Sequence, residues 1–178
     1  MKLLPSVIFI VLAFFQLAHA ETDPLAFARQ GYIACSMPTK NNTCWGFSHF
    51  DFRADGRIFE TDEVAFAESP LLTVAVPPYE IFVTHNEICG RPRNVQTIEN
   101  VVIRREGISL DKAEAAPLAA GVLKAMNDLA GKATCLRFEN EGLETSAQFI
   151  MDGKPIEGSG VNFLWVKSES GLRLSPLS

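Results

Sequence analysis

The sequence predicts an α+β domain: a mostly antiparallel, curved sheet or partly open β-barrel with one main α-helix, with a two-sheet β-sandwich as the alternative. Three observations lead to this fold class. Residues 113–130 have the apolar period of a helix of several turns. Segments rich in β-branched and aromatic residues, bounded by turn residues, lie on both sides of that helix. No long linker and no internal repeat divides the chain, so we expect one domain.

The N-terminus has the pattern of an export signal. Lys2 provides a short basic region, and Val7–Phe15 is an unbroken apolar run. That run is too short for a transmembrane helix, which needs about 20 residues. Residues 18–20 resemble a small-residue cleavage site, so we expect residues 1–20 to be removed as a signal peptide. A single disulfide-stabilised domain would then span residues 21–178.

The charge of the chain argues against two classes of partner. Removal of residues 1–20 takes away one lysine and no acidic residue, so the formal net charge changes from −5 to −6. An acidic chain does not favour general binding to nucleic acid or to anionic membranes. We therefore expect no nucleic-acid partner and no stable membrane insertion after signal removal, while the oligomeric state stays open. The domain is long enough to bury a core without a cofactor, and none is expected.

The four cysteines predict two disulfides, because an even number in an exported chain forms a disulfide framework. They are Cys35, Cys44, Cys89 and Cys135. The first two should pair across a short loop between adjacent strands. The last two should then pair and tie the end of the helix to the strand region before it. A zinc site is disfavoured, because no C-x-x-C pair is present and His49 and His85 lack the spacing of metal ligands.

Strand propensity and turn residues predict ten strands along the chain. These are residues 32–36, 44–53, 57–61, 71–76, 79–84, 95–104, 134–139, 146–151, 161–167 and 172–174. The strongest local signal is the hairpin at Asp55-Gly56, since this dipeptide tolerates the positive φ angles of a tight turn. Residues 47–53 should therefore pair with 57–61. Pro77-Pro78 removes two backbone donors and predicts a bend or a sheet edge.

The helix should pack one apolar face against the sheet. The side chains expected on this face are Leu118, Val122, Met126 and Leu129. Asp111 and Glu114 have the spacing of a capping box, and Gly131 is a suitable residue for the C-terminal end. Pro117 falls in the second turn, so it should kink the helix or delay its start.

No residue spacing is specific for one reaction. Ser48, His49 and Asp51 are the residue types of a hydrolase triad, but alternation along a strand places Ser48 opposite the other two. His49 and Asp51 would meet His85 and Glu87 at a metal only if their strands were neighbours. We therefore expect no catalytic residue and no metal site, and enzymatic activity is left uncertain.

Two functions remain. The first is an exported, non-enzymatic binding or interaction protein of the periplasm or cell envelope, or a secreted one, whose partner is an unknown protein or envelope component. The loop with Arg91 and Arg93 is its candidate surface, because two arginines stand out on an acidic chain and suit carboxylates or phosphates. The alternative is a small-ligand pocket or a weak hydrolase, with Trp45, Phe47 and His49 lining the cavity.

Overall fold

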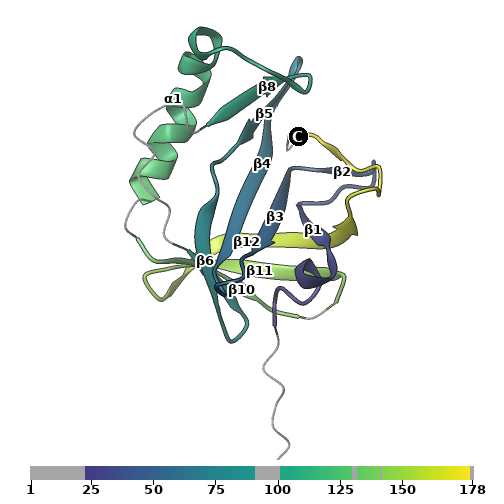
Figure 1. Ribbon diagram of the computed structural model, residues 1–178, viewed down its shortest axis with the longest axis vertical. Coiled ribbons are helices and arrows are strands. Elements are labelled where there is room, and N and C mark those ends of the chain that lie inside the picture. The colour runs from purple at the N-terminus through teal and green to yellow at the C-terminus, as the bar shows by residue number, and fades with distance from the viewer. Residues whose placement is uncertain (1–22, 91–100, 130–131, 141, 177–178) are drawn as a thin grey trace, which may run out of the picture.

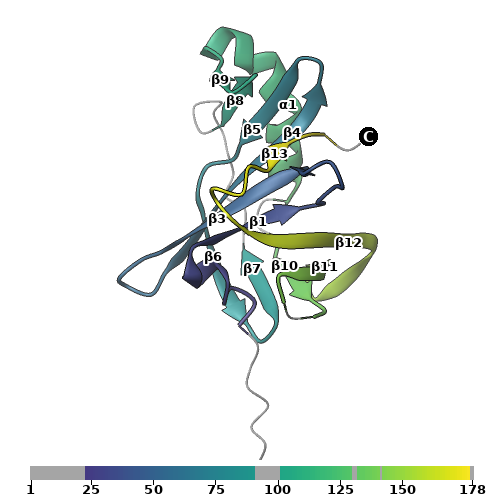
Figure 2. The same cartoon turned by 90° about the vertical axis from the view of Figure 1, so that its right-hand side faces the viewer.

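The computed structural model describes residues 23–90, 101–129, 132–140 and 142–176 (Figures 1 and 2). The predicted signal peptide, residues 1–20, lies outside these ranges, as do Arg91 and Arg93. In chain order the elements are η1 (Ala28–Gln30, a 3₁₀ helix), β1 (Tyr32–Ser36), β2 (Thr43–Cys44), β3 (Gly46–Phe52), β4 (Ile58–Glu68), β5 (Leu71–Ala75), β6 (Tyr79–Thr84), β7 (Glu87–Gly90), β8 (Val102–Arg105), β9 (Ile108–Ser109), α1 (Lys112–Leu129), β10 (Thr134–Phe138), β11 (Glu144–Met151), β12 (Lys154–Lys167) and β13 (Arg173–Leu174).

Eight of these strands form a closed antiparallel barrel in the order β3-β1-β12-β11-β10-β7-β6-β4, and β4 pairs back onto β3. This confirms the predicted α+β class of a curved sheet with one main helix. The barrel is closed rather than partly open, and the alternative of a two-sheet sandwich is not formed. Because the barrel is closed, each of its eight strands pairs with a neighbouring strand on both sides.

Strand β4 is long enough to belong to two parts of the fold. Residues 58–64 pair with β3 inside the barrel, and residues 63–68 pair with β5. Strands β8 and β9 continue the sheet beyond β5. Figure 1 shows α1 beside β5 and β8, above strands β10 to β12. The helix therefore packs on the sheet extension and not inside the barrel.

The predicted hairpin is confirmed. Phe52 pairs with Ile58, and the Arg53 amide donates to the Arg57 carbonyl at 2.9 Å. Gly56 has a φ of +85°, which glycine adopts without steric penalty. Asp55, in contrast to the expectation for this dipeptide, does not have a positive φ. It stabilises the turn through its carboxylate, which accepts from the Arg57 amide and pairs with the Arg57 guanidinium at 2.8 Å.

Most other predicted strands are found, with four differences. Strands β4 and β12 extend well beyond the predicted ranges 57–61 and 161–167. The expected strand 44–53 is divided into β2 and β3, because Cys44 pairs with Leu174 in a parallel two-stranded sheet while the Trp45 amide donates to the Ser36 carbonyl. Only the end of the expected strand 95–104 lies in a described region, as the start of β8. The short strands β7 and β9 carried no clear sequence signal.

Aromatic side chains pack together at the end of the barrel nearest the N-terminal segment. Trp165 is 3% exposed and packs against Phe27 and Phe50, with ring centroids 6.3 and 5.9 Å away. Leu25, fully buried, packs into the same cluster from the segment before η1. Burial of these large apolar surfaces is the main contribution to the stability of the barrel.

The helix begins at Lys112, so Pro117 lies inside it and does not delay its start. Asp111 caps it as predicted: its Oδ1 accepts from the amides of Ala113 and Glu114, both at 2.9 Å. Glu114 lies 3.5 Å from the Arg105 guanidinium and so joins the helix to β8.

The buried face of the helix is only partly the predicted one. Ala119 is fully buried and Ala115 is 5% exposed, and both pack with Val74 and Ile103 of the sheet extension. Leu118, Val122 and Leu123 flank them, partly buried. The side chains of Met126 and Leu129 lie outside the described set. The face is centred on alanines because small side chains allow the helix to approach the sheet closely.

We expect Ala119→Asp to lower the free energy of unfolding by about 3 kcal/mol or more, because it places a carboxylate in this apolar contact. Ala120 is the matched control, since it is the next residue and is exposed. Ala120→Asp should change stability by about 0.5 kcal/mol or less. Urea denaturation of the two variants measures the difference, and equal losses would contradict the assigned face.

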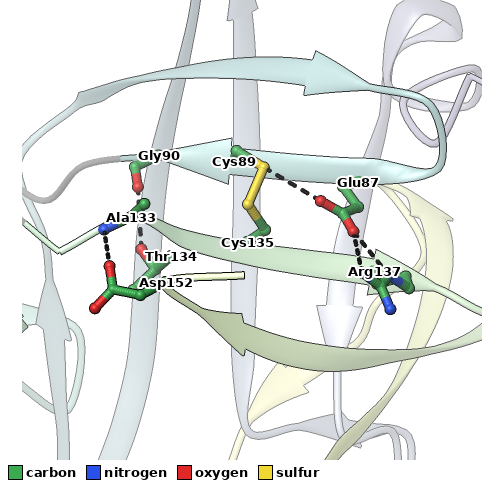
Figure 3. The surroundings of a disulfide bond; sticks show 8 residues. All are labelled: Glu87, Cys89, Gly90, Ala133, Thr134, Cys135, Arg137 and Asp152. Carbon is green, nitrogen blue, oxygen red and sulfur yellow. Dashed lines mark hydrogen bonds and ion pairs between the residues drawn. A yellow bond between two sulfur atoms is a disulfide. The ribbon is translucent and has the colours of Figure 1, made fainter. Parts of the chain in front are cut away.

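Both predicted disulfides are present. Cys35 pairs with Cys44, and their Cα atoms are 5.5 Å apart. Cys89 pairs with Cys135 directly across strands β7 and β10, as Figure 3 shows. Two disulfides indicate a non-cytosolic compartment, because cytosolic thiols are kept reduced. In the described ranges, no helix is both long and apolar enough for a membrane span.

The two bridges should contribute unequally to stability. They close loops with sequence separations of 9 and 46 residues. On the chain-entropy relation, replacing Cys35 and Cys44 by alanine should cost about 2.5 kcal/mol, and replacing Cys89 and Cys135 about 4 kcal/mol. Guanidinium denaturation of the two double variants measures both values. The reverse order of stability would show that local packing at the short loop outweighs chain entropy.

Candidate functional site

The three predicted pocket residues do not line a cavity together. His49 is exposed on the outer face of β3, while Phe50, next to it, packs into the barrel core. Phe47 packs beside the Cys35–Cys44 disulfide, and Trp45 is partly buried at the start of β3. In the described part of the chain, the main cavities are lined by other residues.

The structure also separates the residues of the other candidate sites. Ser48 donates its hydroxyl proton to Asp62, not to His49. His49 lies on β3, whereas His85 follows β6, and β4 lies between these strands in the sheet order. The histidines are therefore not on neighbouring strands, which the metal-site hypothesis required.

Glu87, Cys89 and Cys135 lie within 4.8 Å of one another but do not form a metal site (Figure 3). The two sulfur atoms are bonded to each other, so neither is a thiolate that could bind a cation. The Glu87 carboxylate accepts from Arg137 at 2.7 Å and is already paired. This group holds β7 against β10.

A cavity of about 310 Å³, which we call the Glu60 cavity, lies at the end of the barrel opposite the N-terminal segment. Its lining comes from six barrel strands, β4, β6, β7, β10, β11 and β12: Glu60, Tyr79, Ile81, Ile88, Gly90, Thr134, Cys135, Leu136, Phe149, Ile150, Met151 and Ile156. Several lining residues are paired across neighbouring strands: Glu60–Tyr79, Ile81–Gly90, Gly90–Thr134 and Thr134–Met151. The lining therefore lies at one level along the barrel axis.

Two of the lining residues, Glu60 and Tyr79, belong to a polar cluster that also contains Ser48 and Asp62. The Ser48 hydroxyl donates to Asp62 Oδ1 at 2.5 Å, and the Tyr79 hydroxyl donates to Asp62 Oδ2 at 2.8 Å. Glu60 lies two residues before Asp62 on the same face of β4 and is 6% exposed. The cluster therefore joins strands β3, β4 and β6 through two carboxyl groups and two hydroxyl groups.

Burial changes the proton affinity of this cluster. It raises the pKa of Glu60 well above its ordinary value, and the nearby Asp62 charge adds to the effect. Burial also raises the pKa of Asp62, although the hydroxyls of Ser48 and Tyr79 oppose this by stabilising the carboxylate. The pKa of Tyr79 is raised well above its ordinary value, first by burial and then by the two acids. These pKa shifts favour the protonated carboxyl form of Glu60 and the phenol form of Tyr79.

The rest of the Glu60 cavity is apolar. Ile81 and Ile88 are buried and belong to the main core. Phe149 and Ile156 also line it, although they are 39% and 38% exposed. Exposed large apolar side chains at the wall of a cavity are typical of sites that receive an apolar group.

A second, larger cavity of about 760 Å³ lies at the other end of the barrel, beside Phe27, Phe138 and Trp165. Its polar groups are engaged in local structure. Asp23 accepts from the Leu25 amide, and Asn140 accepts from the Thr145 hydroxyl and the Ser146 amide. These contacts stabilise the loops at that end. We therefore take the Glu60 cavity, which has a buried acidic side chain in its wall, as the candidate site.

Comparison with protein-family models, curated proteins and solved structures found no match. The function is therefore inferred from the site itself.

The buried Glu60 predicts a pH dependence of stability. Because the folded state holds this proton more tightly than the unfolded state, the free energy of unfolding should fall as the pH rises above 4.5, the ordinary pKa of the group. Glu60→Gln removes this carboxyl group, so the free energy of unfolding of the variant should fall less between about pH 4 and about pH 8. Urea denaturation across this range measures both slopes. The control is Glu80→Gln, on the exposed side of β6, which should keep the wild-type slope.

Proposed function

We propose that the protein is an exported binding protein that holds a small, partly apolar ligand in the Glu60 cavity. The observation that carries this proposal is a cavity of about 310 Å³ whose lining has the neighbouring polar side chains of Glu60 and Tyr79 at one side and mostly apolar side chains elsewhere. Ligand sites generally have volumes of about 300–1,000 Å³ and this division of polar and apolar lining.

The two disulfides support export, because such bonds persist in oxidising compartments. The signal-like pattern of residues 1–20 supports the same conclusion and points to the periplasm or the exterior of the cell. A surface interaction through Arg91 and Arg93 stays a prediction, because both residues lie outside the described ranges.

Binding is favoured over hydrolysis by the way the serine is held. The Ser48 hydroxyl is hydrogen-bonded to a carboxylate, whereas serine nucleophiles are generally activated by a stronger base such as histidine. His49, the nearest histidine in sequence, lies on the outer face of β3. The cluster is therefore better suited to recognise a polar group than to activate Ser48.

Gly90 offers a way to block the cavity. A Cβ atom at this position would lie 3.4 Å from both Ile81 Cγ2 and the Tyr79 ring, which is ordinary van der Waals contact, and its backbone does not require glycine. Gly90→Ala should fit, whereas the three further carbons of Gly90→Leu would occupy the cavity. The uncharged fluorescent probe phenylnaphthylamine should bind the wild type and Gly90→Ala, and at least about tenfold more weakly to Gly90→Leu.

Near-ultraviolet circular dichroism should show that both Gly90 variants are folded. Equal probe affinity of the leucine variant and the wild type would show that the probe binds elsewhere. Absence of binding to the wild type and to Gly90→Ala would contradict the proposed function.

A further inference from the structure

Strands β11 and β12 lie side by side (Figure 2), but they do not pair evenly where they pass the Glu60 cavity. Regular pairing stops on either side of Phe149, at the pairs Gln148–Gly160 and Ile150–Pro155. Phe149 alone therefore lies opposite residues 156–159 of β12. Extra residues on one strand form a β-bulge, which changes the direction of the side chains near it. Residues 156–159, which we call the β12 bulge, thus set the position of Ile156 at the cavity.

Ser159 holds the β12 bulge in place. Its hydroxyl donates to the Ile156 carbonyl at 2.6 Å, and the Phe149 amide donates to the Ser159 hydroxyl oxygen at 3.2 Å. Gly158 has a φ of +71°, a conformation that glycine adopts without steric penalty. The bulge is therefore a defined structure that is tied to β11 through a side chain.

Phe149 and Ile156 mark the opening of the Glu60 cavity. Both are exposed, whereas the other residues of the lining are buried or half-buried. A side chain that lines a cavity and is also exposed lies at the boundary between the cavity and the solvent. A ligand that enters here contacts both side chains, and exposed apolar groups at such a place are typical of binding sites.

The polar side chains of the lining have partners within the protein. Glu60 belongs to the polar cluster, and the Tyr79 hydroxyl donates to Asp62 at 2.8 Å. The Thr134 hydroxyl donates to the Gly90 carbonyl at 3.1 Å. Among the described residues, no buried side-chain nitrogen or oxygen atom lacks a hydrogen-bond partner. A ligand consequently gains most of its binding free energy from apolar contact.

The lining compensates neither sign of charge. None of the described residues that line the Glu60 cavity is a lysine, arginine or histidine, so an anionic group meets no cation there. Glu60 is the acidic residue of the lining, and in its favoured protonated form it carries no charge that would pair with a cation. Transfer of an unpaired charge from water into such surroundings is unfavourable. The cavity therefore selects against charged ligands.

We infer that the ligand of the Glu60 cavity is an uncharged molecule with a hydrocarbon body, which lies at the cavity opening against Phe149 and Ile156. This inference rests on the proposed function and specifies the class of ligand and the residues that contact it at the opening. The unfavourable desolvation of a charged group supplies the selectivity, while the apolar side chains supply contact area.

Isothermal titration calorimetry with three probes of equal chain length tests the class of ligand: octanol, octylamine and octanoate. At about pH 7, octylamine carries a positive charge and octanoate a negative charge. Octanol should bind the full mature protein at least about tenfold more tightly than either charged probe. Gly90→Leu, whose side chain would occupy the cavity, should weaken octanol binding about tenfold or more.

Two alanine variants test the contacts at the opening. Ile156→Ala and Phe149→Ala each remove apolar contact at an exposed position, so each should weaken octanol binding about fivefold or more and leave the protein folded. The matched control is Ile108→Ala, because Ile108 is 73% exposed on β9 and is not among the residues of the lining. It should change octanol binding about twofold or less. Near-ultraviolet circular dichroism of every variant shows whether it is folded.

The outcomes separate this inference from the proposed function. If octylamine or octanoate binds as tightly as octanol and Gly90→Leu weakens that binding, the uncharged class is wrong although the cavity remains a binding site. Unchanged octanol affinity in both Ile156→Ala and Phe149→Ala would show that the ligand does not lie against the β12 bulge. If none of the three probes binds the wild type, or Gly90→Leu binds octanol equally well, the inference is wrong together with the cavity as a small-ligand site.

Discussion

The pairing of β4 with β3 is the contact on which the rest of the structure depends. Its seven residue pairs run from Gly46–Val64 to Phe52–Ile58 and close the barrel. Gly46 permits this approach, since a Cβ atom there would lie 2.8 Å from Val64 Cγ1 and 2.9 Å from Ser36 Oγ. The same pairing brings Ser48 beside Asp62, and β4 continues beyond it to form the sheet on which α1 packs. Barrel closure, the polar cluster and the docking of the helix thus share one strand.

The two ends of the barrel interior differ in the chemistry of their side chains. Around Trp165, aromatic side chains pack against one another and bury large apolar surfaces beside the larger cavity. At the other end, Glu60 lines the smaller cavity, and burial of Glu60 is unfavourable for the fold when the group is charged. Ionisable groups that reduce stability and have shifted pKa values tend to gather at functional sites. Apolar burial at the aromatic end offsets the unfavourable burial of Glu60 at the polar end.

Local features of the fold could be predicted because neighbouring residues determine them. Gly56 marks the hairpin through its φ angle, Asp111 caps the helix through its own side chain, and the disulfide pairing followed from the short loop between Cys35 and Cys44. The helix face was only partly right. Ala115 and Ala119 carry weak hydrophobic signals, and their burial depends on how closely the sheet approaches. Short strands such as β7 were missed, because pairing with β6 and β10, not composition, makes them strands.

The candidate site was not predicted from the sequence. On β4, the apolar Ile58 and the acidic Glu60 both face the interior, while the apolar Phe59 faces outward. Each face of the strand therefore carries both apolar and polar residues, and the sequence pattern does not show which face is buried. The aromatic residues Trp45 and Phe47 were a stronger signal, but they lie outside the cavity lining. The sequence by itself determined the α+β class, the helix, the hairpin and the cysteine pairing, since these depend on local periodicity, turn conformation and loop length. Tertiary structure alone decided which carboxyl groups are buried and where the cavity lies, because that cavity exists only when six strands distant in sequence meet around it.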